Sequence, residues 1–162
     1  MDALAGLGPV SETYAHLPVE QAFTWSPAAE QMPPGEWYMV AFRSVRRAGA
    51  DEGRLGLLDD RAHAEAEHAP GFVHYFKGPT AADGSCLSFC LWTSRATARA
   101  AAGRPAHSRA AGMVHEMYEQ YRLEFLRVRR ETAGALLFEP YDPVADDTTS
   151  PAAILSPRPI PS

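Results

Sequence analysis

The sequence predicts a single α+β domain of the ferredoxin-like type, the split βαβ fold that also builds dimeric α/β barrels. Two observations predict it. Between residues 36 and 130, strand-like and helix-like segments follow one another in the order β-α-β-β-α-β. The length of 162 residues suits one hydrophobic core with an extension at each end. We therefore divide the chain into an N-terminal arm (1–34), an α+β domain (35–141) and a C-terminal tail (142–162).

The arm is rich in glycine and proline and has little periodicity. It nevertheless contains Phe23 and Trp25, large apolar residues that a free terminal segment would rarely keep. We expect the arm to pack on the body of the domain or on a partner subunit. The tail is Pro-rich, which predicts an extended chain.

The first half of the domain contains a strand over residues 36–47, rich in β-forming residues and free of Gly and Pro. A Gly-rich loop over residues 49–56 follows. Asp59 or Asp60 can then cap a helix that Pro70 ends. On this helix His63 and Glu67 form an i, i+4 pair that we expect to face solvent.

The second half begins with strands over residues 71–78 and 85–93, and Asp83-Gly84 between them predicts a hairpin. A helix starts near Ser94, breaks around residues 103–105 and resumes with Pro105 in its first turn. A last long strand covers residues 121–130, and residues 134–141 can add a short one.

The last long strand is apolar on both faces, since Leu123 and Phe125 alternate with Leu126 and Val128. Two helices cover only one face of a four-stranded sheet, so the other face needs a cover of its own. A second copy of the same sheet would provide it, which predicts a homodimer.

Composition narrows the functional classes. A net charge of −5 argues against a general nucleic-acid binder. The sequence has neither a run of about 18 apolar residues nor a signal peptide, so we expect a cytoplasmic protein with no membrane partner. Cys86 and Cys90 would lie about 13 Å apart along one strand, too far for a disulfide, and are predicted to be free thiols.

Residues 70–110 carry a family resemblance. Pro70-Gly71-Phe72 opens a strand, Trp92-Thr93-Ser94 closes one, and Ala106-His107 lies on the broken helix. This stretch resembles the middle of the antibiotic-biosynthesis-monooxygenase-like group of dimeric α+β barrels. The resemblance implies a pocket between helices and sheet, in which cofactor-free oxygenases of the group convert polycyclic phenols to quinones.

Haem-degrading relatives in the group bind iron through a histidine on the second helix, where His107 falls. They also use an asparagine on the first strand and a tryptophan on the second helix. This chain contains no asparagine, and residues 95–118 contain no tryptophan. We therefore expect no cofactor, with haem bound by His107 as the alternative.

Two histidines are the candidate catalytic residues. His107 lies one helical step from an apolar face, where a neutral imidazole can take a proton from a phenol or ligate a metal. His74 lies within a strand, and alternation places it on one face with Phe72 and Phe76. It is an acid-base group or a ligand if that face lines a pocket, and a satisfied core histidine if that face lies in the dimer interface. No acidic or histidine cluster has ligand spacing, so we predict no dedicated metal site.

Five further residues are candidates for substrate binding. Arg43 shares an otherwise apolar strand face with Trp37 and can steady a phenolate or carboxylate, or it can mark where the strand leaves the core. Trp92 ends a strand, and Met113 belongs to the apolar helix face. Tyr118, at a helix-to-strand junction, can offer its hydroxyl to a pocket or simply pack there.

The first functional hypothesis is a small dimeric enzyme that binds an aromatic or polycyclic metabolite between helices and sheet. Its reaction would be a monooxygenase-type conversion without a cofactor, with His107 as the acid-base group. The alternatives are a haem-binding member of the group and a non-catalytic ligand-binding or structural dimer.

Overall fold

The computed structural model describes residues 3–142, so the predicted tail lies outside the described residues. Its centre is one antiparallel sheet with the strand order β2-β3-β1-β4-β5. The strands are β1 (Gly35–Arg46), β2 (Phe72–Phe76), β3 (Ser85–Trp92), β4 (Tyr118–Arg130) and β5 (Leu137–Pro140). The first four strands have the order of a ferredoxin-like sheet, and β5 extends the edge beside β4. The predicted fold class is confirmed.

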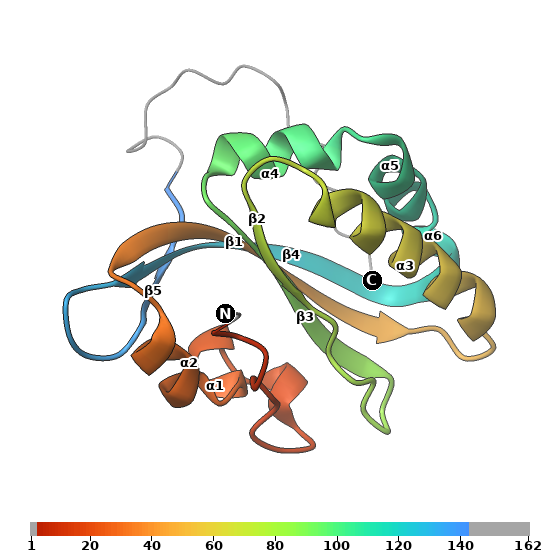
Figure 1. Cartoon of the computed structure of the whole chain (residues 1–162). Helices are drawn as coiled ribbons and strands as arrows, with labels where there is room; N and C mark the ends of the chain where they lie inside the picture. The colour runs from red at the N-terminus through yellow and green to blue at the C-terminus, as the bar shows by residue number, and fades with distance from the viewer. Residues whose placement is uncertain (1–2, 143–162) are drawn as a thin grey trace.

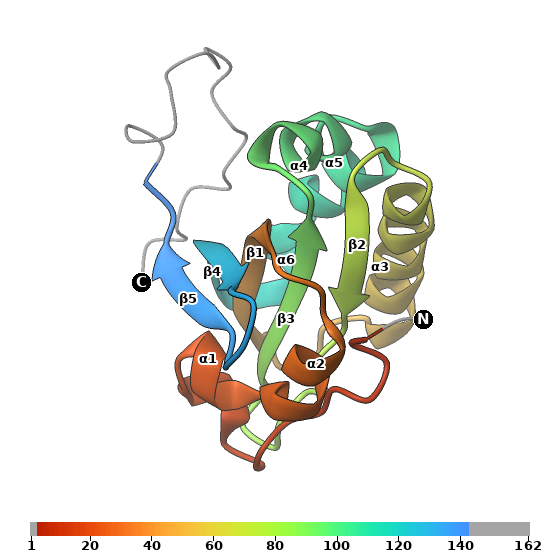
Figure 2. The same ribbon diagram turned by 60° about the vertical axis from the view of Figure 1, so that its left-hand side comes forward.

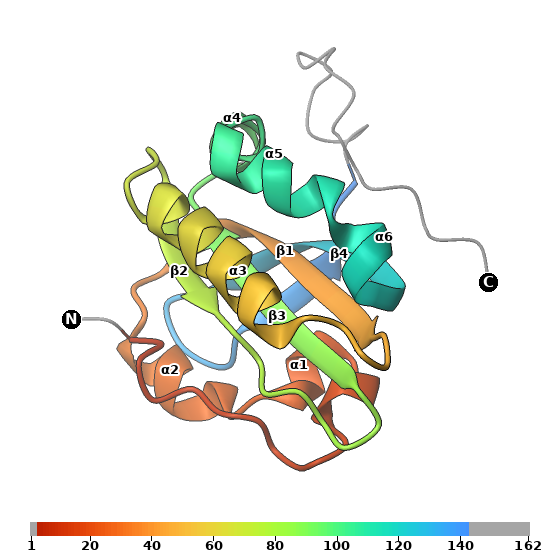
Figure 3. The same cartoon turned by 90° about the vertical axis from the view of Figure 1, so that its right-hand side faces the viewer.

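Four helices cover one face of the sheet (Figures 1 and 3). They are α3 (Glu52–Glu67), α4 (Arg95–Ala102), α5 (Pro105–Gly112) and α6 (Val114–Met117). The break between α4 and α5 falls where the sequence places it, with Pro105 in the first turn of α5. Proline is tolerated there because the first turn of a helix needs no backbone donor. Within the described residues, no helix is long and apolar enough to cross a membrane.

Helix α3 begins earlier than the sequence suggests. The Asp51 side chain accepts a hydrogen bond from the Arg54 amide at 3.0 Å and caps the helix, so Gly53 and Gly56 lie in its first turns instead of in a loop. Asp59 and Asp60 are therefore interior residues of α3. The side-chain cap offsets the low helix propensity of the two glycines.

The N-terminal arm lies against the other face of the sheet (Figure 2). It contains the 3-10 helix η1 (Tyr14–His16) and the short helices α1 (Val19–Ala22) and α2 (Trp25–Gln31). Its buried side chains join one core cluster with side chains of β1, β3 and β4. Aromatic rings form the centre of this cluster: Phe23 contacts Phe76 and Phe89, with ring centroids 5.0 and 5.5 Å apart.

The outer face of the sheet is covered by the arm and not, as expected, by a second copy of the sheet. The second face of β4 is apolar, as predicted, and Val128 on that face is buried. It is the chain's own arm that covers the face, because Trp25 and its neighbours supply the apolar surface that a second copy would have supplied. The two-faced strand thus requires no partner.

Candidate functional site

A cavity of about 450 Å³ lies between the sheet and the helices α3 to α6. Volumes of this size are typical of small-molecule sites. Its floor is the helix-facing side of β1, β3 and β4, including Val40, Phe42 and Phe125, and its roof includes Leu55, Ala62 and Ala110. The walls are therefore mainly apolar, with polar and charged side chains among them.

His107 lies in the wall of this cavity. Glu65 of α3 holds the start of its helix: the carboxylate accepts hydrogen bonds from the amides of Ala106, at 3.1 Å, and His107, at 3.3 Å. A carboxylate at a helix N-terminus satisfies amides that have no partner within the helix. Burial lowers the pKa of His107 below its ordinary value, while Glu65 and the nearby Ala102 carbonyl oppose that shift. The imidazole is thus neutral near pH 7 and can accept a proton.

Three predicted binding residues line the same cavity as His107: Trp92, Met113 and Tyr118. Trp92 ends β3 and donates its indole N–H to the Cys90 sulfur at 3.0 Å. Met113 follows α5, and Tyr118 begins β4. Cys86 and Cys90 are free thiols, as the sequence predicts, and burial raises the pKa of Cys90 to about 12, which leaves it unreactive.

The other three predicted residues lie on the opposite face of the sheet and do not line this cavity. Arg43 and Trp37 share the β1 face that the arm covers. The Arg43 guanidinium bonds to Glu124 at 2.5 Å and to the carbonyls of Ala15 and Leu17, both at 2.7 Å. Arg43 also borders a hollow of about 550 Å³ between the arm and β4–β5, but its donors already hold the arm in place.

His74 lies on the arm side because of an irregularity in β2. The pairing of β2 with β3 shifts between Phe72 and His74. As a result Phe72 packs with Trp92 on the helix side, whereas the His74 ring lies 6.3 Å from Phe89 in the arm-facing core. The expectation that Phe72 and His74 share a face is wrong, since a bulge breaks the alternation of a regular strand.

A second group of polar residues in the cavity was not predicted. Asp59 of α3 accepts a hydrogen bond from the Tyr75 hydroxyl at 2.9 Å and pairs with Lys77 at 3.0 Å. Tyr121 of β4 lines the cavity nearby. The signal missed was helical spacing from Asp51: once α3 begins there, Asp59 falls two turns later and faces the sheet. Burial, followed by the neighbouring Asp59, raises the pKa of Tyr75.

His63 also borders the cavity. It pairs with Glu67 at 3.1 Å, as predicted, and its ring lies 4.6 Å from the ring of Tyr75. The pair is therefore half-buried at the edge of α3 instead of facing solvent entirely.

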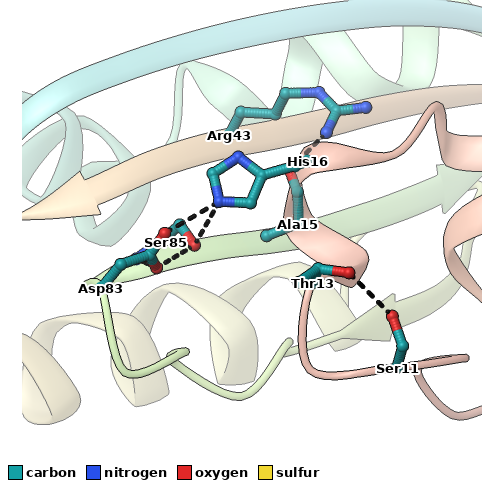
Figure 4. A network of polar contacts seen from close by, with 7 residues as sticks. All are labelled: Ser11, Thr13, Ala15, His16, Arg43, Asp83 and Ser85. Carbon is teal, nitrogen blue, oxygen red and sulfur yellow. Dashed lines mark hydrogen bonds and ion pairs between the residues drawn. The ribbon is translucent and has the colours of Figure 1, made fainter.

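A serine, a histidine and an aspartate meet outside the cavity, where η1 contacts the β2–β3 hairpin (Figure 4). The His16 Nε2 atom lies 2.8 Å from Asp83 and 3.3 Å from the Ser85 hydroxyl, which also bonds to Asp83. A catalytic triad needs the carboxylate on one ring nitrogen and the serine on the other. Here both contact the same nitrogen, so the group ties the arm to the hairpin. Hydrogen bonds from Ser85 and His16 keep the pKa of Asp83 well below its usual value.

Within residues 3–142, no cluster of three or more histidine, cysteine, aspartate or glutamate side chains has the arrangement of a metal site.

Comparisons with known proteins bear on this site. A family model described as PB2B2.08-like matches residues 1–139. UPF0643 protein PB2B2.08 of Schizosaccharomyces pombe is 29% identical over 131 residues, which cover 70% of this chain. The chain spans about 60% of the length of that curated relative.

Solved structures show the same fold. NE2512 of Nitrosomonas europaea has a TM-score of 0.50 at 13% identity, covering 62% of this chain and 96% of its own. SO0527 of Shewanella oneidensis also reaches 0.50, at 12% identity, covering 57% and 90%. SnoaB of Streptomyces nogalater, a cofactor-independent oxygenase, reaches 0.46 at 18% identity, covering 61% and 96%. The two structures with a TM-score of 0.50 confirm the fold that the resemblance implies, and at these identities the likeness extends no further.

Proposed function

The chain belongs to the PB2B2.08-like family, and on the premise of its fold and cavity we propose that it binds an aromatic or apolar metabolite between its helices and its sheet. One observation supports this above all. A cavity of about 450 Å³ with largely apolar walls contains a neutral histidine held in place by Glu65. Such a pocket favours a mainly apolar ligand with a proton that His107 can accept.

The proposed reaction is an oxygenation that needs no bound cofactor. His107 removes a proton from an acidic CH₂ group next to an aromatic ketone or phenol, and the resulting carbanion transfers electrons to dioxygen. In balance, R₂CH₂ and O₂ give R₂C=O and H₂O: the carbon loses four electrons and dioxygen gains them. This transfer turns two neutral groups into an ion pair, which apolar walls disfavour. The Glu65 carboxylate opposes that cost, because its charge raises the affinity of His107 for the proton.

Oxygen uptake with anthrone as the probe tests this proposal. We expect formation of anthraquinone above the background without protein, and a loss of about 100-fold or more in His107→Ala, as for a general base. His68→Ala is the matched control, because His68 caps α3 outside the cavity. Binding of anthrone without turnover would overturn the oxygenase and favour the non-catalytic ligand-binding protein. Absence of binding would overturn the whole proposal.

Haem is the alternative occupant of the cavity. A neutral His107 suits an axial ligand. The propionates of haem also need cations. Of the Arg and Lys side chains in the cavity lining, Arg46 pairs with Glu52, Lys77 pairs with Asp59, and Arg99 has an interaction of its own. These residues therefore fit an apolar ligand better than haem. A Soret band on adding haemin, lost in His107→Ala, would favour haem instead.

A homodimer stays a prediction for this chain. The arm covers the outer face of the sheet. Two copies could therefore pair either through surfaces that the arm leaves exposed or through this sheet face after the arm has moved away. Sedimentation of the full chain at micromolar concentration gives the answer, and a monomer mass would contradict the prediction.

A further inference from the structure

Two tyrosine hydroxyls in the cavity have no hydrogen-bond partner within residues 3–142. Tyr118 and Tyr121 both line the cavity, and neither phenol bonds to a side chain or to the backbone there. Other tyrosines are satisfied: the Tyr14 hydroxyl donates to the Pro79 carbonyl at 2.6 Å, and the Tyr75 hydroxyl donates to Asp59. Neither hydroxyl oxygen is among the buried unsatisfied atoms of the described residues, so both are open to the cavity rather than sealed in the core. A ligand oxygen in the cavity can therefore accept a hydrogen bond from them.

The two hydroxyls belong to one end of the cavity. Tyr118 and Tyr121 pair across the sheet with Arg46 and Ser44 at the end of β1, and their ring centroids lie 5.5 Å apart. Trp92 pairs with Tyr38 near the other end of β1. Burial raises the pKa of Tyr118 to about 12 and also raises that of Tyr121, so both phenols are neutral donors at physiological pH.

The charged groups near these phenols are already paired. Asp59 holds Lys77 and the Tyr75 hydroxyl, and Glu52 holds Arg46 at 2.9 Å. The positive charges of both pairs are balanced by a carboxylate, although Arg46 keeps a buried Nε donor without a hydrogen-bond partner. An anionic ligand would add a charge with no counter-charge in these pairs, and it would meet the Asp59 carboxylate. An uncharged oxygen acceptor, in contrast, satisfies the phenol hydroxyls without burying a new charge.

We infer that Tyr118 and Tyr121 hydrogen-bond to a carbonyl oxygen of a mainly apolar, uncharged ligand, and so set the ligand's orientation in the cavity. This inference rests on the proposed function only in taking the cavity as a ligand site. It adds the two residues that recognise the carbonyl oxygen and the end of the cavity at which that oxygen lies. His107 does not take part in this recognition.

Calorimetric titration with three matched probes tests the inference: naphthalene, which has no acceptor, 1-acetonaphthone, which has a carbonyl, and 1-naphthoate, which carries a charge. We expect the ketone to bind about 3- to 10-fold more tightly than naphthalene, the effect of one or two net hydrogen bonds. The naphthoate should bind more weakly than the ketone. The double variant Tyr118→Phe, Tyr121→Phe should lose the preference for the ketone and keep the affinity for naphthalene.

Tyr38→Phe is the matched control, since its phenol lines the cavity at the Trp92 end. It should keep the preference for the ketone. If the preference vanishes in Tyr38→Phe but survives in the double variant, the inferred position is wrong. If the naphthoate binds most tightly, the inferred class is wrong. Equal binding of naphthalene and ketone overturns the inference while leaving the cavity as a ligand site, whereas no binding of any probe overturns the proposed function as well. Thermal unfolding of each variant reports whether its fold is intact.

Discussion

The buried ring of His107 makes stability depend on pH, and the neighbouring Glu65 carboxylate reduces that dependence. Burial lowers its pKa in the native state, so the unfolded chain binds the proton more readily. The free energy of unfolding contributed by this residue is therefore lost as the pH falls from about 7.5 toward the pKa of an unfolded histidine and below. Denaturant unfolding at pH 7.5 and 5.5 should show a smaller difference between the two pH values for His107→Gln than for the wild type.

His68→Gln serves as the control for that measurement, because His68 is exposed and bonds to the Ala64 carbonyl at 2.8 Å. It should retain the pH dependence of the wild type. An unchanged pH dependence in His107→Gln would show that the ring is hydrated in the native state. Asp83 acts in a separate and more acidic range, since its depressed pKa adds stability that is lost only below its ordinary pKa.

Gly71, in the Pro70-Gly71-Phe72 segment that carries the family resemblance, occupies a position that requires glycine. Its φ is 81°, and a Cβ there would lie 2.5 Å from the Thr97 Cβ and 2.6 Å from the Thr93 hydroxyl. We expect Gly71→Ala to lower the free energy of unfolding by about 1–2 kcal/mol, because an alanine is strained at this positive φ. The overlap of its Cβ with Thr97 and Thr93 should lower it further. Gly56→Ala, inside α3 with nothing within 4 Å of the added Cβ, should raise stability by up to about 1 kcal/mol. Equal effects of the two substitutions in denaturant unfolding would contradict this reasoning.

At the scale of elements, the contact between α3 and α5 holds the roof of the cavity. Glu65 caps α5 through two amides, so Glu65→Gln should lower stability by about 1 kcal/mol and speed amide exchange at Ala106 and His107. Glu67→Gln, two residues along and pairing with His63 at the half-exposed edge of the helix, should change stability by less than about 0.5 kcal/mol. Thermal unfolding and hydrogen exchange measure both effects, and equal losses would argue against the cap.

Helix α3 and strand β2 differ from what their residues predict. Asp59 and Asp60 were the expected caps of α3, but Asp51 caps the helix and takes two glycines into it. Alternation along residues 71–78 placed Phe72 and His74 on one face, but the shifted register separates them. The start of a helix and the register of a strand each have alternatives of similar free energy within the local sequence. Contacts with distant segments of the chain decide between these alternatives.

At the scale of the whole molecule, the arm is part of the core. The Trp25 ring lies 5.4 Å from that of Phe89 and 5.0 Å from that of Phe138, and its indole N–H donates to the Val19 carbonyl at 2.9 Å. Trp25→Ala should cost about 3–5 kcal/mol of stability. Loosening of the arm would also expose the apolar sheet face, so the variant should associate at concentrations at which the wild type does not change its mass.

Analytical ultracentrifugation with denaturant unfolding measures both consequences. Leu57→Ala in α3 is the control, since Leu57 is a large apolar residue that is 51% exposed and should affect neither quantity by much. A Trp25→Ala protein with the stability and mass of the wild type would show that the arm does not contribute to the core.

The sequence by itself determined the order of the strands and helices between residues 36 and 130, the broken helix at Pro105 and the free cysteines. It also determined on which of these elements His107, Trp92, Met113 and Tyr118 lie. These follow from local periodicity, helix-start chemistry and the pleat of a strand, which act over a few residues. Only the tertiary structure decided that the arm covers the sheet, that Arg43 and His74 face the arm, and that Asp59, Tyr75, Tyr118 and Tyr121 meet in one cavity. Those contacts join segments far apart in the chain, and their free energy depends on what lies opposite in space, which no local pattern contains.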